Sequence, residues 1–242
     1  MKVWSMIVTI LGDLCRSRQD TIPSKSLHRL TGRMGVSDQA VRVALHRLRR
    51  NGWVESQQTG RESSYSLSEI GWGETQRVRG QIYPEPAAEH PDACLIVAPS
   101  ADLLPDDALI VAPRTAVVDH PPNPMPKEVL VTKLDPGHLP DWLVELLAGK
   151  SLREDYATLA EIVARVVHPP DTASMLDATV LRLLILHQWR RLRLRHSTLP
   201  DSLLGPDWEG ARARASVMQA LKKFKRPRVE ELSEVGTTAA SG

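Results

Sequence analysis

The sequence predicts an α+β protein with an N-terminal winged helix-turn-helix, a small ferredoxin-like α+β middle domain and an all-α C-terminal domain. Three observations support this class. A short helix, a basic helix and a hairpin come first, four short apolar runs of strand length come next, and helical periodicity dominates the remainder. We therefore expect domains at residues 1–83, 84–150 and 151–228, followed by a flexible tail at 229–242.

The N-terminal domain should begin with a helix at residues 3–15, whose apolar stripe packs on the helix-turn-helix. Residues 25–33 are expected to form the first helix of the pair, and residues 32–36 the turn. Ser37 is a good N-cap for the second helix, because its side-chain oxygen can accept a hydrogen bond from the first turn. Gly52 then ends that helix, since glycine tolerates the left-handed backbone of a C-terminal cap.

The segment after the second helix predicts a β-hairpin, which is the wing of the domain. Residues 53–56 and 64–67 are extended in character, and residues 57–60 between them are typical of a turn. Ser68 can cap a further helix that runs to about Tyr83 and links the domain to the rest of the chain. Helix, turn, helix and hairpin in this order predict a winged helix-turn-helix.

The second helix of the pair is rich in side chains that suit DNA. A helix on a small rigid bundle fits the major groove, where each base pair shows a distinct pattern of donors and acceptors. Arg42 could pair with guanine and Gln39 or His46 with another base edge, whereas the later arginines are better placed for phosphates. An arginine-rich helix can also be a solvated face and nothing more. The predicted DNA-binding residues are Ser37, Gln39, Arg42, His46, Arg47, Arg49, Arg50, Tyr65 and, at the hairpin tip and able to enter the minor groove, Arg61.

A net charge of +2 hides an uneven distribution of charge along the chain. Residues 1–82 carry a balance of +6, residues 83–170 a balance of −8 and residues 171–242 a balance of +4. The N-terminal third should therefore bind a polyanion, and the acidic middle of the chain should repel one. The partner that these charges favour is double-stranded DNA.

Two cysteines, Cys15 and Cys94, lack the spacing of metal ligands and provide no disulfide framework, as is typical of a reducing cytoplasm. The first residues contain a short apolar run without a small-residue cleavage site, which favours a helix over a signal peptide. No window reaches the ~18 uninterrupted apolar residues of a membrane span. These observations predict a cytoplasmic protein.

Four apolar runs predict the strands of the middle domain, at residues 93–98, 107–112, 114–119 and 129–134. The loops between them are rich in proline, which is tolerated there but not in central strands. Only about eight residues separate the first two runs, which is too few for a full crossover helix. The middle domain is therefore expected to be a shortened one.

Three carboxylates, Asp102, Asp106 and Asp107, crowd the loop after the first of these strands. A metal-dependent nuclease could use acids in such a place, and this is the enzyme class that competes with a non-enzymatic function. A solvated acidic loop is the simpler interpretation. The sequence gives no reason to expect a catalytic set, a bound metal or a cofactor.

Helical periodicity begins at residue 151 and continues almost to the end of the chain. A first helix should end before Pro169, because proline cannot continue it. The next, at residues 173–195, is apolar nearly all round, which places it in the middle of its domain. Its last turns carry arginines, which suit the negative end of the helix dipole. Residues 206–224 are expected to form a third helix.

Two motifs resemble the PaaX family, repressors of bacterial phenylacetate catabolism. They are VSDQAVRVALHRLRRNGW with GRESSYSLS in the head, and RLLILHQWRRLRLRHSTLPDSLLGPDWEG near the C-terminus; the early ILGD at residues 10–13 is also similar. The resemblance covers most of the chain and is weakest at residues 84–140. It implies a homodimeric transcription regulator, usually a repressor, that an aryl-acetyl coenzyme A thioester such as phenylacetyl-CoA releases from its operator.

The chain departs from the family pattern in two places. The wing of the family usually repeats arginine where this chain has Arg61-Glu62, and Glu62 should be repelled by DNA phosphates. The middle domain is short, so a ligand that uses it could differ from the usual thioester. The first departure could change the affinity of the chain for DNA, and the second could change which acyl coenzyme A thioester it binds.

A coenzyme A thioester brings phosphates, so its site should offer arginines beside an apolar slot for the acyl group. Arg182 stands out as one charge inside an apolar helix, and a buried charge needs a partner. Asp177 or Glu161 could provide a structural ion pair instead of a ligand. The candidate ligand-binding residues are Arg182, His187, Trp189, Arg190, Arg191 and Trp208.

The function that the sequence favours is a ligand-released repressor of a catabolic operon. Its two heads would meet successive major grooves of a near-palindromic operator, with half-sites ~10 base pairs apart or a multiple of that. A metal-dependent nuclease and an architectural DNA binder without ligand are the alternatives. A specific regulator should prefer its operator over random DNA by ~10³ or more, whereas an architectural binder should not.

Overall fold

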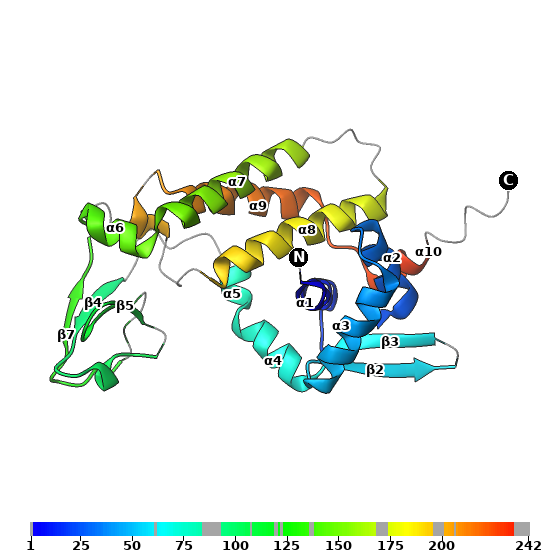
Figure 1. Cartoon of the computed structure of the whole chain (residues 1–242), viewed down its shortest axis with the longest axis horizontal. Coiled ribbons are helices and arrows are strands. Elements are labelled where there is room, and N and C mark those ends of the chain that lie inside the picture. Colours follow the sequence, from blue (N-terminus) through cyan, green and yellow to red (C-terminus); the bar gives the residue numbers. More distant parts are fainter. Residues whose placement is uncertain are drawn as a thin grey trace. The chain divides into compact units, whose positions relative to one another are not determined.

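The chain forms two compact units from interleaved segments. The first unit comprises Met1–Gly80, Val163–Trp189 and Val217–Gly242, and the second comprises Gln81–Ile162 and Arg190–Ser216. The structure is a computed structural model (Figure 1), and it describes residues 2–60, 62–83, 93–106, 108–118, 121, 123–135, 138–167, 174–195, 201–205 and 207–234.

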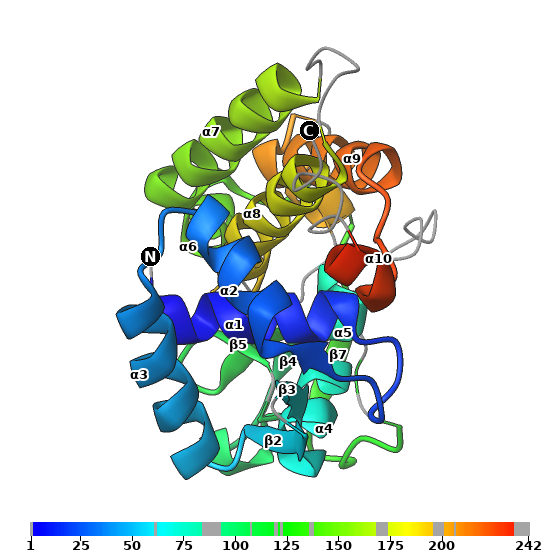
Figure 2. The ribbon, with the colours of Figure 1, turned by 90° about the vertical axis from the view of Figure 1, so that its right-hand side faces the viewer.

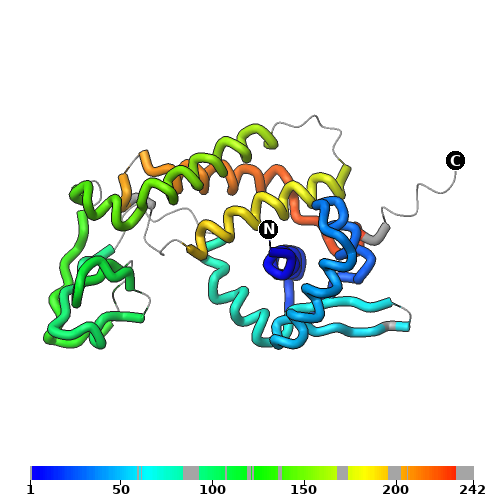
Figure 3. The backbone as a smooth tube through the Cα atoms, viewed as in Figure 1, coloured from blue at the N-terminus to red at the C-terminus, as the bar shows by residue number. Residues whose placement is uncertain are grey.

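The head, which we define as Val3–Arg77, has the predicted order of helix, turn, helix and hairpin (Figure 1). Its elements are α1 (Val3–Leu14), β1 (Ile22–Pro23), α2 (Ser24–Arg33), α3 (Asp38–Arg50), β2 (Val54–Thr59), β3 (Glu62–Leu67) and α4 (Glu69–Arg77). The small sheet has the order β1-β3-β2 and is antiparallel throughout. Its hairpin register runs from Val54 opposite Leu67 to Thr59 opposite Glu62, and Figure 3 shows the two strands side by side.

Two glycines allow the chain to turn and pack closely in the head. Gly52 has a φ of +71° directly after α3, so it provides the predicted end of that helix. Gly71 lies in α4, where a Cβ atom would stand 2.2 Å from the carbonyl oxygen of Trp53. The predicted cap at Ser68 is confirmed, because its hydroxyl oxygen accepts a hydrogen bond from the Gly71 amide at 3.0 Å. Two short helices, α4 and α5 (Arg79–Ile82), stand in place of the single predicted one.

The core of the first unit surrounds α1, and Figure 2 shows α2 and α3 beside that helix. Its stripe of Ile7, Ile10, Leu11 and Leu14 is fully buried, as the periodicity of the sequence predicts. Residues from much later in the chain complete this core. They are Leu176, Val180 and Leu183 of α8 (Met175–Arg193) and Leu232 of α10 (Val229–Glu234).

The prediction of a flexible tail from residue 229 is wrong for its first six residues, which form α10. The segment is rich in glutamate, and one leucine, Leu232, gives little periodic signal in the sequence. Leu232 is nevertheless only 4% exposed, because it packs into the core of the head. Residues 235–242 lie outside the described part of the chain.

The second unit contains a four-stranded sheet (Figure 1). Its order is β5-β6-β4-β7, and every neighbouring pair is antiparallel. The strands are β4 (Cys94–Val97), β5 (Leu109–Ala112), β6 (Thr115–Val118) and β7 (Leu130–Lys133), so all four predicted strands are confirmed. A ferredoxin-like domain carries a helix in both crossovers. Among the described residues, the first crossover holds only the three-residue η1 (Ala101–Leu103), and the second holds no helix.

Helices cover this sheet and complete the second unit. Leu143 and Leu147 of α6 (Asp141–Leu147) pack with Val117 of the sheet and with Leu203 of η2 (Asp201–Leu204). The helices α7 (Lys150–Val166) and α9 (Glu209–Lys223), like α8, are divided between the two units. The three consecutive domains expected from the sequence therefore stay a prediction, because the compact units combine segments that are distant in the chain.

Candidate DNA-binding surface

Helix α3 has one apolar face and one polar face, and this division sets its orientation. Ser37 is the N-cap, since its hydroxyl oxygen accepts a hydrogen bond from the Ala40 amide at 3.3 Å, and Asp38 adds an acid in the first turn. The apolar side chains fall at helical spacing and pack against α1 and the rest of the core. They are Val41, Ala44, Leu45 and Leu48, each at most 5% exposed.

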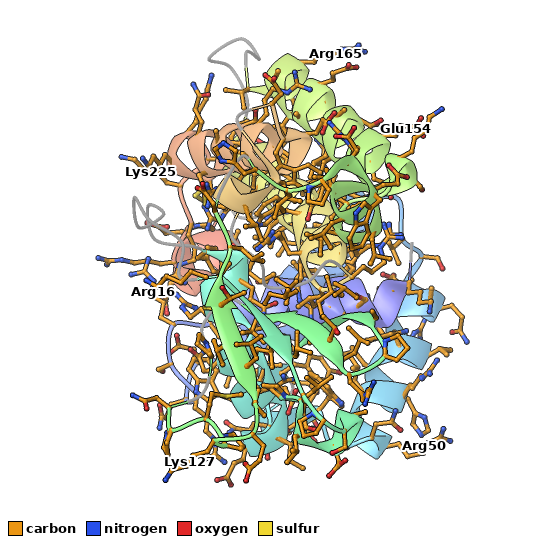
Figure 4. All side chains as sticks on the ribbon, turned by 90° about the vertical axis from the view of Figure 1, so that its left-hand side faces the viewer. Arg16, Arg50, Lys127, Glu154, Arg165 and Lys225 are labelled. Carbon is orange, nitrogen blue, oxygen red and sulfur yellow. The ribbon has the colours of Figure 1, made fainter. Side chains whose placement is uncertain are left out.

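The side chains that the sequence predicts for DNA lie on the other faces of α3. They are exposed to solvent, and Figure 4 shows Arg50 pointing away from the end of the helix. DNA binding requires this arrangement, because the same residues turned inward could not reach a base edge. The exposed members of the predicted set on α3 are Gln39, Arg42, His46, Arg47, Arg49 and Arg50.

A groove separates the C-terminal half of α3 from the first strand of the hairpin. Arg49 and Arg50 line one wall together with His46, and β2 provides the other wall. Guanidinium groups along such a groove suit a phosphodiester backbone, which they can contact by charge-assisted hydrogen bonds. The β2 residues in the wall are Val54, Glu55, Ser56 and Gln57.

Arg47 takes a different direction from the other arginines of α3. Its guanidinium carbon lies 5.9 Å from the centre of the Trp4 ring of α1, within the range of a cation–π contact. This contact orders the side chain near the beginning of α1, at a flank of the helix. A flank position suits a phosphate contact better than a base contact, which is the role the sequence predicts for Arg47.

The hairpin holds the remaining predicted DNA contacts. Tyr65 lies in the central strand β3 opposite Ser56, and its half-buried ring packs against the core of the head. Arg61, the predicted minor-groove residue, lies outside the described residues. The ring of Tyr65 therefore has a packing role, and its contact with DNA stays a prediction.

Glu62 is paired with a lysine of the first helix of the pair. The Lys25 Nζ atom lies 2.7 Å from a carboxylate oxygen of Glu62, and both side chains are exposed. The hydrogen bond and the charge of Lys25 lower the pKa of Glu62, while those of Glu62 raise the pKa of Lys25. The predicted repulsion of phosphate by Glu62 is thus partly offset by a neighbouring cation, which ties α2 to the wing.

One exposed residue of α3 was missed by the sequence reasoning. Val43 is 59% exposed and lies on the polar side of the helix, one turn from both Gln39 and His46. The helical pattern alone could have found it, because Val43 falls off the stripe formed by Val41, Leu45 and Leu48.

Arg182, the leading ligand-binding candidate, is engaged in a buried ion pair. Its Nε and Nη2 atoms donate to the two carboxylate oxygens of Asp13 at 2.7 and 2.8 Å. Its Nη1 atom donates to the carbonyl oxygens of Leu221 and Phe224, both at 2.9 Å. A structural ion pair was the expected alternative to a ligand, but its acid is Asp13, whereas Asp177 pairs with Arg33. These four hydrogen bonds give Arg182 a structural role inside the first unit.

The other ligand candidates are divided between the two units. His187 and Trp189 lie in the first and are buried, with His187 Nδ1 3.1 Å from the hydroxyl of Thr9. Trp208 lies in the second, where its ring packs edge-on against Tyr156 with a centroid distance of 5.4 Å. Arg190 and Arg191 also belong to the second unit. The six candidates therefore do not gather within one unit.

Arg190 and Arg191 differ in their exposure to solvent. Arg191 is exposed, whereas Arg190 is half-buried. Burial lowers the pKa of the Arg190 guanidinium, and Tyr83 acts in the opposite direction. An exposed or half-buried arginine can still reach an external phosphate, and a ligand role for these two stays a prediction.

The acidic loop of the second unit does not assemble a metal centre in the described residues, which contain no group of three His, Cys, Asp or Glu side chains placed to hold an ion. Asp102 has a lowered pKa because the Ser100 side chain donates a hydrogen bond to it, and it is exposed. Asp107 lies outside the described residues. Cys15 and Cys94 are buried thiols, and neither forms a disulfide. No helix in the described part of the chain is long and apolar enough to span a membrane.

Comparisons with known proteins match both ends of the chain. A model of PaaX-like proteins matches residues 2–71, and a model of the PaaX-like protein C-terminal domain matches residues 148–232. The transcriptional repressor PaaX of Escherichia coli (strain K12) is 25% identical over 271 residues, covering 97% of this chain and 84% of that protein. A solved structure, the uncharacterized protein Rv0674 from Mycobacterium tuberculosis, is 18% identical with a TM-score of 0.48, covering 95% of this chain and 99% of that one. Because the two models match in order and together span well over half of the sequence, the chain belongs to the PaaX-like family.

Proposed function

We propose that this protein is a transcriptional repressor, not an enzyme, and that it binds operator DNA through α3 and the β2–β3 hairpin. The observation that carries the proposal is the division of α3 into a buried apolar face and a solvent-facing row of arginine, glutamine and histidine. The arrangement of helix, turn, helix and hairpin is that of a winged helix-turn-helix, which presents such a helix to the major groove. The similarity to a named transcriptional repressor supports the same function.

The contacts divide into two classes. Gln39, Arg42 and His46 lie in the first two turns of α3 or directly after them, where recognition helices contact base edges. Arg49 and Arg50 line the groove beside β2, where a phosphate backbone would fit. Arg47 flanks the helix against Trp4 and would contact a phosphate as well.

The protein would act in the cytoplasm as a homodimer, so that two heads meet half-sites ~10 base pairs apart or a multiple of that. An acyl coenzyme A thioester would release it by binding better to a dimer whose heads are wrongly spaced. Within the predicted ligand set, Arg190 and Arg191 suit the phosphates of coenzyme A, since Arg182 is already held by Asp13.

The direct test is a gel-shift titration of the protein on its own upstream DNA and on random DNA of the same length at physiological salt. We expect a preference of ~10³ or more for the upstream DNA. Equal affinity for both would support an architectural binder and contradict the proposal. A panel of aryl and acyl coenzyme A thioesters, added to the bound complex, then identifies the effector by release.

A further inference from the structure

Val43 is an apolar residue on the otherwise polar solvent face of α3. It is 59% exposed, whereas the buried face of the same helix already contains the four apolar side chains that hold it to the core. Neither packing nor helix propensity accounts for it, because a β-branched side chain favours a helix less than alanine does. Its position leaves an apolar side chain on the helix surface that a partner outside the chain could contact.

The neighbours of Val43 indicate the chemistry of that partner. Gln39 lies four residues before it, His46 three residues after it and Arg50 seven residues after it, so the four side chains form one stripe along the helix. All four are exposed. Val43 is therefore an isolated apolar side chain among side chains that carry positive charge or form hydrogen bonds. Such a stripe is complementary to a partner surface that is polar and anionic and that carries a methyl group opposite Val43.

We infer that Val43 is a specificity-determining residue that contacts the C5-methyl group of a thymine in the operator. The inference rests on the proposed DNA binding through α3. Among the groups that the four base pairs show in the major groove, that methyl group is the apolar one. Val43 would favour a T·A pair at the position it faces, while Gln39 and His46 on the same stripe form hydrogen bonds with adjacent base edges.

The test removes the methyl group without changing base pairing. Each thymine in the part of the upstream DNA that the bound protein covers is replaced in turn by deoxyuridine. The affinity of the protein for each duplex is measured by fluorescence anisotropy at fixed salt. For the unaltered protein we expect about a fourfold loss at one thymine per half-site, which is the equivalent of about 0.8 kcal/mol for one methyl-sized apolar contact. Replacing the other thymines should change affinity little.

Two variants of Val43 connect the loss to this side chain. V43A should bind the operator more weakly and should no longer distinguish thymine from deoxyuridine at the sensitive position. V43T keeps the shape but replaces one methyl group by a hydroxyl, and it should reduce the discrimination as well. The control is I70A, which removes another strongly exposed apolar side chain of the head from α4. It should keep the full response to deoxyuridine.

A protein that prefers its operator but ignores every thymine methyl group would overturn this inference alone. The same holds if V43A responds to deoxyuridine as strongly as the unaltered protein does. Equal binding of upstream and random DNA would instead overturn the proposed function, and the inference would go with it. A deoxyuridine effect that is lost only in the Val43 variants would support both.

A 5-methylcytosine presents the same methyl group on a different base pair. A duplex with 5-methylcytosine at the sensitive position, paired with guanine, therefore separates recognition of the methyl group from recognition of the whole T·A pair. We expect it to recover part of the affinity lost with unmethylated cytosine. No recovery would mean that the neighbouring hydrogen bonds, and not Val43, discriminate at this position.

Discussion

Asp13 and Arg182 form a bidentate ion pair inside the first unit, although 169 residues separate them in the chain. Their side chains are 1% and 8% exposed, so the pair is almost completely removed from water. Arg226 adds a hydrogen bond from its guanidinium to the backbone carbonyl of Asp13 at 2.9 Å. The interaction joins α1 of the head to α8 and to the segment that follows α9.

Removal of one member of this pair should destabilise the protein severely. In R182M the Asp13 carboxylate keeps its burial but loses two charge-assisted hydrogen bonds, and the carbonyls of Leu221 and Phe224 lose their donor as well. We expect a loss of about 3–5 kcal/mol in the free energy of unfolding, measured by urea denaturation. The double variant D13L/R182M should recover part of that loss, because it leaves no unpaired charge in the core. A single variant as stable as the unaltered protein would refute a structural role for the pair.

Leu232 provides a second test of how the C-terminus supports the head. L232A should lower the free energy of unfolding by about 2–5 kcal/mol, because the side chain is buried in the core beside α8 residues. The matched control is L194A, since Leu194 is 41% exposed and should tolerate the same truncation. Similar unfolding midpoints for both variants would mean that α10 does not contribute to the core.

The two proposed classes of DNA-binding residue predict different phenotypes. R42A should relax base preference at one operator position, with a cost of about 1–3 kcal/mol for the preferred base. R49A should weaken operator and random DNA alike, and should flatten the dependence of log affinity on log salt by about 0.9 for each phosphate that the protein no longer neutralises. K127A, which removes an exposed lysine of the second unit, is the control. Identical behaviour of R42A and R49A would contradict the division into residues that bind bases and residues that bind phosphates.

The Lys25–Glu62 pair should restrain the affinity of the wing for DNA. E62Q removes the negative charge beside the hairpin and releases Lys25 for a phosphate, so we expect tighter binding and a steeper salt dependence. The companion variant K25A should weaken binding, because Glu62 then faces the backbone without its cation. E69Q, a change of an exposed acid on α4, should have a smaller effect. Unchanged affinity in E62Q would place the hairpin away from the DNA.

The thiol of Cys15 should make stability depend on pH in the alkaline range. Burial, and to a smaller extent the charge of Asp20, raises the pKa of this thiol from 9.0 to about 12. Between these values the unfolded chain releases the thiol proton while the folded chain keeps it, so stability should fall as the pH rises from about 9 to 12. C15A lacks this contribution. The difference in urea midpoint between the two proteins should therefore shrink as the pH rises above about 9, and a constant difference would contradict the prediction.

Local patterns were sufficient for most of the fold. The periodicity of residues 38–50 and the caps at Ser37 and Ser68 predict α3 and α4, and the four apolar runs predict the strands of the second sheet. These features depend on neighbours within a few residues, which the sequence shows directly. The solvent-facing side chains of α3 followed from the same periodicity.

Long-range partners could not be predicted in the same way. Arg182 visibly needed an acid, but the sequence suggested Asp177 or Glu161, whereas the partner lies on α1. The helix at residues 229–234 has little apolar surface to bury, so its packing depends on a surface formed by distant segments. The sequence also could not show that Glu62 would meet Lys25, 37 residues earlier.

The core of the head includes Leu232, which lies far along the chain from α3. A polypeptide is made from its N-terminus, so α3 is synthesised long before α10. The packing that steadies the head is therefore complete only after residue 232 has left the ribosome. A chain truncated before α10 should yield a head whose core is incomplete.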